Sequence, residues 1–287
     1  MAFLDQQPLL GYPLAAAVGL AVGSFLNVVI LRLPRRLEWE WKRDARDILE
    51  LPELYDPPPP GVVVEPSHDP ATGDRLKWWE NIPVLSWVLL RGRSRYSGQP
   101  ISIQYPLVEL LTGLLTLACA WRFGFGWQGF GAMVLTWFLV AASGIDLRTR
   151  LLPDSLTLPL MWLGLVASLD NLFIPAKPAL LGAIVGYVSL WSVWWLFKQV
   201  TGKEGMGHGD FKLLAALGAW VGLKGVLPVI LLSSLLGAVI GAAWLAYRGR
   251  NRATHIPFGP YLAIAGWLVF FWGGEIDAAY RQLTGLY

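Results

Sequence analysis

The sequence predicts an all-α polytopic membrane protein with about eight transmembrane helices and a small loop-rich cytosolic lobe between the first and the second helix. Hydrophobic residues make up 55% of the 287 residues, and the mean hydropathy is +0.48. Apolar runs close to the roughly 20 residues that cross a bilayer core recur along the chain. A polar stretch over residues 32–104 interrupts them after the first run.

The first predicted span covers residues 9–31. No Lys or Arg precedes it and no small-residue cleavage site follows it, so we interpret it as a retained helix and not as a removed signal peptide. The lobe over residues 32–104 begins with a predicted interfacial helix, residues 38–51, whose apolar residues fall on one helical face. Four consecutive prolines, Pro57 to Pro60, then form a stiff spacer that no helix would contain.

Seven further spans are predicted to form a membrane domain over residues 105–287. They cover residues 105–121, 128–145, 156–173, 179–197, 211–223, 226–247 and 257–272. The span over residues 211–223 is short for a bilayer crossing, which is typical of a buried or re-entrant helix. The single cysteine, Cys119, lies inside an apolar run and excludes internal disulfides.

The distribution of Lys and Arg predicts the orientation in the membrane. If the lobe lies in the cytoplasm, 14 Lys and Arg flank the spans on that side and 4 flank them on the other. Both termini then face the periplasm, because the number of spans is even. Asp146 and Asp210 both fall on the cytoplasmic side.

These two acids stand where apolar runs meet polar loops. Asp146 closes an apolar run, and Asp210 ends a glycine-rich stretch that includes Gly207 and Gly209. A carboxylate at a membrane helix end is costly and therefore indicates function, and closely spaced glycines let the backbone approach another segment. Two adjacent carboxylates share one proton. The ionised member can activate water while the protonated member polarises a peptide carbonyl, so the pattern predicts an aspartyl dyad.

Structural roles compete with this interpretation. A single Asp at a membrane helix end is often a helix cap or the partner of an Arg. Asp154 fits a helix start, and Glu109 fits the first turn of a helix. His208 fits a loop position. The placement of Asp146 and Asp210 on one side of the membrane favours the dyad.

Short motifs follow one another in a fixed order along nearly the whole chain. They cover residues 23–30, 32–34, 80–83, 101–102, 105–110, 145–146, 152–154, 205–213 and 257–261. In this order and spacing they resemble the motifs of the type IV prepilin peptidases, which are membrane aspartic peptidases of the GxGD type. Any one motif is weak evidence, whereas the ordered set is specific.

The resemblance implies that Asp146 and Asp210 are the catalytic aspartates, with Gly207 and Gly209 supporting them. It implies cleavage of the leader peptides of type IV prepilins and type II secretion pseudopilins at the cytoplasmic face of the bacterial inner membrane. It also implies N-methylation of the new N-terminal residue with S-adenosylmethionine as the methyl donor. The implied partners are these substrates and the lipid bilayer, and no nucleic acid is expected.

The lobe departs from the family pattern at four positions. Family members carry two CxxC pairs suited to a tetrahedral zinc site, and alignment puts these pairs at Asp69 with Thr72 and at Ser94 with Ser97. Since no thiolate remains, we expect no zinc and a lobe that is held together by packing. The side chains expected to pack are those of Trp78, Trp79, Ile82 and Trp87.

Candidates for the cofactor site are Gly92, in a basic turn, and Asn81. Turn and packing roles fit both residues equally well. The missing thiolates bear on methylation more than on proteolysis, because the two aspartates lie elsewhere in the chain.

Two other functions remain open. A presenilin-like intramembrane protease shares the GxGD motif but pairs it with Tyr-Asp, whereas Ile145 precedes the other acid here. A non-catalytic transporter or assembly factor could use the two acids as a proton relay. That function predicts that Asp210→Asn leaves leader cleavage intact.

Overall fold

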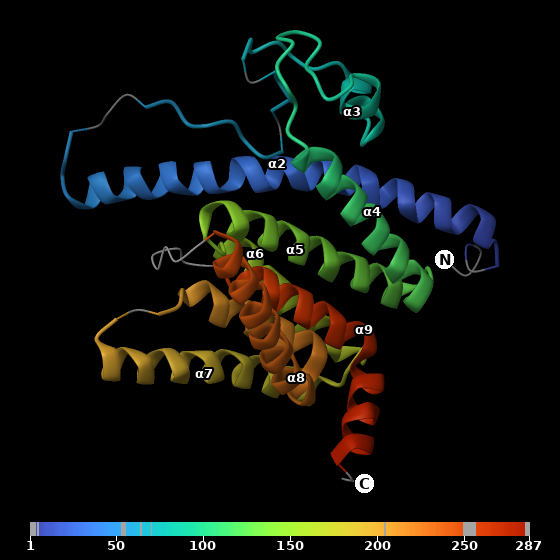
Figure 1. Cartoon of the computed structure of the whole chain (residues 1–287), viewed down its shortest axis with the longest axis vertical. Coiled ribbons are helices and arrows are strands. Elements are labelled where there is room, and N and C mark those ends of the chain that lie inside the picture. The colour runs from blue at the N-terminus through green and yellow to red at the C-terminus, as the bar shows by residue number, and fades with distance from the viewer. Residues whose placement is uncertain are drawn as a thin grey trace. The chain divides into compact units, whose positions relative to one another are not determined.

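The computed structural model describes residues 4, 6–52, 56–63, 65–69, 71–203, 205–248 and 257–284. Within these residues the regular structure is helical, with two isolated β-bridges besides (Figure 1). Six of the described helices are long and apolar enough to cross a membrane, and α6 (Asp154–Leu169) is a shorter apolar helix. The predicted all-α polytopic fold is confirmed, whereas the count of eight spans is not.

The chain divides into two compact units, Met1–Ala141 and Ala142–Tyr287. Helix α5 (Trp127–Thr149) begins in the first unit and ends in the second. Arg250 and Arg252, which enter the predicted topology, lie outside the described residues, as does Glu204 of the glycine-rich stretch.

Helix α2 (Pro8–Ile48) is one helix of 41 residues. The prediction of a first span followed by a separate interfacial helix is therefore wrong. The helix continues through Pro34, because a proline removes one backbone hydrogen bond but still permits a helical path when the surrounding packing holds. At 1.5 Å per residue, α2 is about 62 Å long, which exceeds the ~30 Å bilayer core. One bilayer crossing therefore accounts for only part of α2.

Small residues set the contact between α2 and α4 (Gln104–Phe123), the main helix pair of the first unit. The small residues Gly11, Ala15, Gly19 and Gly23 recur every four positions on the buried stripe of α2. A Cβ added at Gly19 would lie 2.9 Å from the Cα of Gly113. The two backbones therefore touch, as in other membrane helix pairs with small residues at this spacing.

The segment between α2 and α4 is the loop-rich lobe. Its described helices are short: η1 (Trp78–Asn81) and α3 (Leu85–Leu89). One β-bridge pairs His68 with Arg75, and another pairs Arg93 with Pro100. Each bridge closes a tight turn, so the lobe is built from two turns of similar form.

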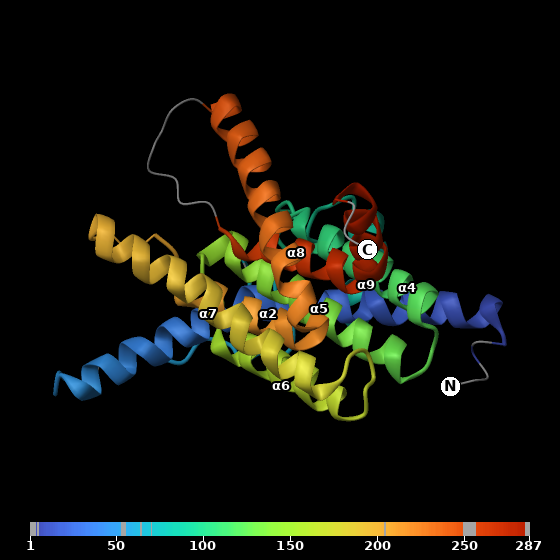
Figure 2. The ribbon, with the colours of Figure 1, turned by 90° about the horizontal axis from the view of Figure 1, so that it is seen from below.

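The second unit is centred on α8 (His208–Arg248), which packs against α6, α7 (Ala176–Thr201) and α9 (Gly259–Thr284). Figure 2 shows α7 and α8 side by side, seen from below. Helix α8 breaks at Gly222, whose φ of 74° is left-handed. The two spans predicted over residues 211–223 and 226–247 therefore meet at this break. A second break, at Trp272 of α9, coincides with the predicted end of the last span.

The first half of α8 is the core of the second unit. Phe211, Leu213, Leu214 and Leu217 are all fully buried. The prediction of a buried helix at this place is confirmed. Gly182 of α7 and Gly218 of α8 face each other so closely that neither has room for a Cβ, so the two helix backbones are in contact.

Candidate functional site

Asp146 lies near the C-terminal end of α5 and is 4% exposed. The backbone N–H of Gly259, the first residue of α9, donates a hydrogen bond to Asp146 Oδ2 at 2.9 Å. There is no room for a side chain between them, because a Cβ on Gly259 would lie 2.7 Å from the same oxygen. The start of α9 therefore fixes the Asp146 carboxylate at close range.

Asp210 lies in the first turn of α8 and is 8% exposed. Its N–H donates to the carbonyl of Gly207 at 3.3 Å. The glycine before it, Gly209, packs against Leu152, since a Cβ there would lie 2.6 Å from the Leu152 Cβ. The sequence predicted such a close approach from the glycine density, and both Gly209 and Gly205, whose Cβ would lie 2.8 Å from the Phe197 ring, need it.

Leu152 connects the surroundings of the two aspartates. It packs against Gly209, next to Asp210, and its Cδ1 lies 3.1 Å from the Cβ position of Gly259, which binds Asp146. Two buried carboxylates, one from α5 and one from α8, thus lie on either side of contacts made by Leu152 within the second unit.

Two residues with competing structural roles lie at or contact the start of α8. Asp154 is the first residue of α6, as predicted, and both of its oxygens accept from Lys212 Nζ, at 2.6 and 2.7 Å. The predicted loop position of His208 is wrong. This residue begins α8, and its ring packs edge-on against Trp194 and Phe211, with centroids 4.9 and 5.5 Å away.

The two tight turns of the lobe meet at Asp69, which is 2% exposed. Asp69 Oδ1 accepts from the N–H groups of Ala71 and Thr72 at 2.8 and 3.1 Å. Asp69 Oδ2 accepts from the hydroxyls of Ser94 and Ser97, the latter at 2.9 Å. The four positions aligned with the family's cysteines are therefore gathered around one carboxylate.

These hydrogen bonds lower the pKa of Asp69 to about 2, the bond from Ser94 having the largest effect. The Asp69 carboxylate thus links the two turns through hydrogen bonds, at the place where relatives with four cysteines could link them through a metal ion. The prediction that packing alone holds the lobe is therefore incomplete, because it overlooked this acceptor.

The tryptophans that were expected to pack the lobe differ in burial. Trp79 is 40% exposed, whereas Trp87 is partly buried and donates its Nε1–H to the Ile101 carbonyl at 3.2 Å. The side chain of Trp78 lies outside the described part of the chain.

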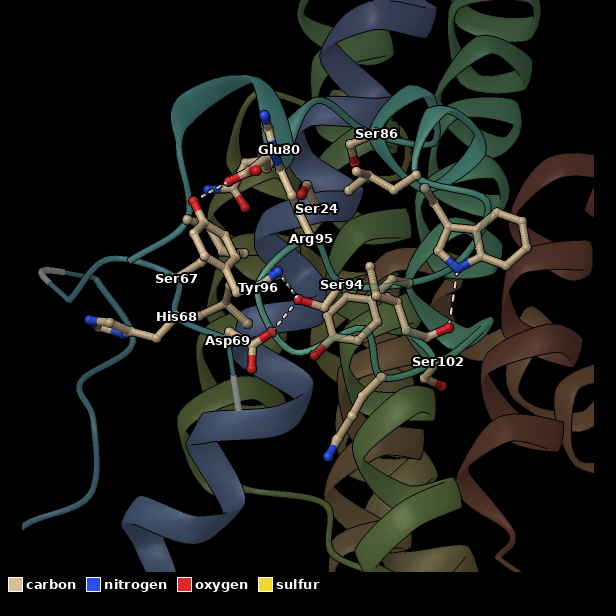
Figure 3. A pocket seen from close by; sticks show the side chains of 18 of the residues that line it. Ser24, Ser67, His68, Asp69, Glu80, Ser86, Ser94, Arg95, Tyr96 and Ser102 are labelled. Atoms are coloured by element: carbon tan, nitrogen blue, oxygen red, sulfur yellow. Dashed lines mark hydrogen bonds between the residues drawn. The ribbon is translucent and has the colours of Figure 1, made fainter. Parts of the chain in front are cut away.

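A cavity of about 550 Å³ lies beside this cluster in the first unit (Figure 3). Asn81 is among its lining residues. Gly92 is not among the lining residues. Its φ is 68°, and a Cβ would lie 2.9 Å from the Trp87 ring. Gly92 therefore packs against the Trp87 ring. Among the described residues, no group of three His, Cys, Asp or Glu side chains could hold a metal ion.

Glu109 also lines the cavity. Its predicted place in the first turn of a helix is wrong, because α4 begins at Gln104, which puts Glu109 in the second turn. Glu109 is 6% exposed, and its Oε2 accepts from the Val84 N–H at 2.7 Å. The carboxylate therefore attaches the lobe to the membrane helix and does not serve the helix start.

Comparison with known proteins covers nearly the whole chain. Residues 17–123 match the Bacterial Peptidase A24 N-terminal domain, and residues 133–242 match the Type IV leader peptidase family. The chain is 76% identical over 286 residues to a prepilin leader peptidase/N-methyltransferase of Xanthomonas campestris pv. campestris, covering 100% of both chains. The chain belongs to the type IV leader peptidase family. No solved structure matches it.

Relatives from other organisms in this family carry the same name. Those of Stutzerimonas stutzeri and Pseudomonas aeruginosa are 52% and 50% identical, over 99% of this chain and 98% of each relative. The predicted family is therefore confirmed. Asp146 and Asp210 both fall within the segment that matches the leader peptidase family, and the Asp69 cluster falls within the N-terminal domain.

Two residues of these sites had no assigned role from the sequence. Gly259 stood in a motif, but only the folded chain reveals that its N–H reaches Asp146. Glu80 likewise stood in a motif beside Asn81. In the structure it is 9% exposed, and its Oε2 accepts from the N–H of Lys77 and the hydroxyl of Tyr96, at 2.8 and 2.9 Å.

Proposed function

We propose that this chain cleaves the leader peptide of type IV prepilins and methylates the new N-terminal amine. Relatives that match it over nearly its whole length are named prepilin leader peptidase/N-methyltransferase. The observation that supports the peptidase activity is that Asp146 and Asp210 are both buried in the second unit, beside glycines that both pack against Leu152. These two residues are the proposed catalytic pair.

The pair cleaves the peptide bond by general acid–base catalysis. Two close carboxylates hold one proton between them. The ionised member takes a proton from a water molecule, whose oxygen attacks the carbonyl carbon, and the protonated member donates to the carbonyl oxygen. The tetrahedral intermediate then collapses, the C–N bond breaks, and the departing nitrogen takes a proton. The proton belongs to the pair, so neither residue is assigned a fixed role.

Backbone groups of the chain orient the two aspartates. The Gly259 N–H binds Asp146 Oδ2 and leaves Oδ1 for the water or for the second carboxylate. Gly209, packed on Leu152, brings the start of α8 close to the segment that follows α5. Such fixed orientation supplies much of the rate in acid–base catalysis. Gly207 and Gly209 therefore support the catalytic pair through the backbone.

The proposed setting is the bacterial inner membrane, with the active site on the cytoplasmic side and both termini in the periplasm. The excess of Lys and Arg beside the lobe supports this orientation. Substrates include type II secretion pseudopilins as well as type IV prepilins, both with a polar leader and an apolar segment. The scissile bond of such a substrate lies at the membrane interface. In the proposed orientation, the C-terminal end of α5 with Asp146 and the start of α8 with Asp210 lie at the same interface.

The proposed methylation uses the first unit, residues 32–104 in particular. When bound, S-adenosylmethionine supplies an electrophilic methyl group, which the amine nitrogen takes as the C–S bond breaks to leave neutral S-adenosylhomocysteine and a proton passes to solvent. The lobe offers a cavity of suitable size, lined by aromatic rings and by the acidic residues Asp69, Glu80 and Glu109. This acidic and aromatic lining fits a cationic ligand with hydroxyl and amino groups.

Intact-mass spectrometry of a prepilin incubated with the purified protein and S-adenosylmethionine tests this proposal. We expect a product that lacks its leader and carries one added methyl group. A product that is cut but unmethylated would remove the methyltransferase activity from the proposal. An uncut substrate, with protein shown to be folded, would contradict the peptidase activity and favour a transport function.

A further inference from the structure

We propose that the ion pair between Lys212 and Asp154 positions the loop over residues 150–153 and, through this loop, the two proposed catalytic aspartates. The inference rests on the proposed peptidase function and adds two positioning residues to it. All of the residues involved lie in the second unit. Both members of the pair act through the loop that joins α5 to α6.

The ion pair joins the starts of two helices that are far apart in the sequence. Lys212 Nζ lies 2.6 Å from Asp154 Oδ1 and 2.7 Å from Oδ2, so both carboxylate oxygens accept from one ammonium group. Asp154 is the first residue of α6, and Lys212 lies just after the first turn of α8, which begins at His208. The pair therefore holds the start of α6 against the start of α8.

The position of Lys212 on α8 indicates that it acts through its partner. A carboxylate at a helix start is favourable, so Asp154 suits its own helix, whereas a cation close to a helix start gains nothing from the helix dipole. Lys212 and Asp210 are two positions apart, about 200° around the axis of a helix with 3.6 residues per turn. Residues at this spacing do not face each other. We therefore assign the contribution of the Lys212 ammonium to its contact with Asp154.

The loop that precedes Asp154 carries Leu152, the side chain that lies between the surroundings of the two aspartates. Leu152 packs against Gly209 and Gly259. Gly209 precedes Asp210 in the chain. The N–H of Gly259 donates to the Asp146 carboxylate. A shift of this one leucine therefore changes the surroundings of both aspartates.

The loop is held at both of its ends. Its first residue, Arg150, donates its N–H to the Asp146 carbonyl at 2.9 Å and has a left-handed φ of 58°. A residue other than glycine keeps this conformation only where its surroundings hold it. Its last residue, Pro153, is buried and has a φ of −65°, which the proline ring fixes. Because Asp154 follows directly, its ion pair holds this end of the loop on α8.

The exposure of the pair distinguishes a positioning role from a stabilising one. The Lys212 and Asp154 side chains are 28% and 56% exposed. Ion pairs with this much contact with solvent contribute little to global stability. Small displacements in an active site act differently, since a misplacement of 1 Å can cost on the order of 100-fold in rate. Breaking the pair should therefore lower the rate of cleavage far more than it lowers the unfolding temperature.

Steady-state kinetics of leader removal from a prepilin, with the purified full-length protein in detergent, test the assignment. Lys212→Met keeps the length of the side chain and removes its charge. We expect kcat to fall at least about tenfold and KM to change by less than about twofold, because the pair does not bind substrate. Lys212→Arg keeps the charge and should restore most of the rate. Lys224→Met, at an exposed lysine beyond the break in α8, is the matched control and should cleave as the wild type.

Asp154→Asn tests the pair from its other side. The losses of Asp154→Asn and Lys212→Met should not multiply in the double variant, because both changes remove the same contact. Losses that multiply, a wild-type kcat in Lys212→Met, or a raised KM alone would each overturn the positioning role. If Lys212→Met does not fold, Asp154→Asn decides by the same comparison of kcat, KM and unfolding temperature. A wild-type protein that cleaves no prepilin would refute the peptidase function itself, whereas wild-type cleavage with unaffected variants refutes only the role of the pair.

Discussion

Substituting Gly259 by alanine should displace the Asp146 carboxylate and, by a smaller distance, the side chain of Leu152. The new Cβ would lie 2.7 Å from Asp146 Oδ2, whereas an ordinary contact begins at 3.4 Å. The two atoms must therefore separate by about 0.7 Å, since carbon–oxygen contacts rarely fall below ~3.3 Å. The nearest atom belongs to the end of a side chain, so the carboxylate rotates away while the backbone of α9 keeps its path.

A displacement of this size has a predictable effect on cleavage. A misplacement of 1 Å in a catalytic group can cost on the order of 100-fold in rate, so we expect Gly259→Ala to lower the cleavage rate by about 10- to 100-fold. The stability cost is bounded by that of overpacking, about 1–3 kcal/mol. The assay is the initial rate of leader removal from a prepilin in detergent, with the unfolding temperature measured on the same sample.

The matched control lies on the same helix. A Cβ at Gly274 meets no atom within 4 Å, so Gly274→Ala should cleave at the wild-type rate. Methylation of a pilin that is already cut should also be unchanged in Gly259→Ala. Wild-type cleavage by Gly259→Ala would refute the argument that this contact positions a catalytic carboxylate.

Two further predictions concern the lobe and the helix bundle. Asp69→Asn should lower the unfolding temperature of the lobe, as read by hydrogen exchange, and a zinc chelator should leave the wild-type lobe unchanged. Because the pKa of Asp69 is lowered to about 2, its stabilising effect should be complete above about pH 4, the usual range of Asp, and should fade as the pH drops toward 2. The Asn variant should lack this step, and a wild-type profile in that variant would contradict the carboxylate's role. Gly218→Val should destabilise the α7–α8 contact by at least the ~1–3 kcal/mol of overpacking, because backbone, not a movable side chain, faces it. An unfolding temperature equal to that of wild type would show that the helices can separate freely.

The places of the apolar helices were predictable because hydropathy is a local property of the sequence, but their number as spans was not: six of the described helices are long enough to cross a membrane, and eight spans were predicted. The break in α8 fell close to its predicted place, since a short apolar run and a glycine mark it. The continuity of α2 was not predictable, because Pro34 and the charges around it favour a helix end. Whether the helix continues past a proline depends on tertiary contacts that the local sequence does not show. The every-four-residue pattern of small residues in α2 is a signal that could have identified its contact with α4.

The hydrogen bonds that hold the lobe together could not be predicted from its residues one at a time. Alignment placed Asp69, Thr72, Ser94 and Ser97 at the family's cysteine positions, and each of the last three is a poor zinc ligand. Only the folded lobe shows that two hydroxyls and two N–H groups converge on a single carboxylate. Likewise, the sequence predicted which two aspartates to pair, but not that Gly259, from a third helix, holds one of them.

The most direct test of the central claim compares Asp146→Asn and Asp210→Asn, each as purified protein, by intact-mass spectrometry of two substrates. Both variants keep the shape of the side chain but cannot share a proton. We predict that each loses nearly all cleavage of a prepilin, as expected when one member of a catalytic unit is removed, while each still methylates a pilin that is already cut. Cleavage at the wild-type rate by either variant would contradict the aspartyl dyad.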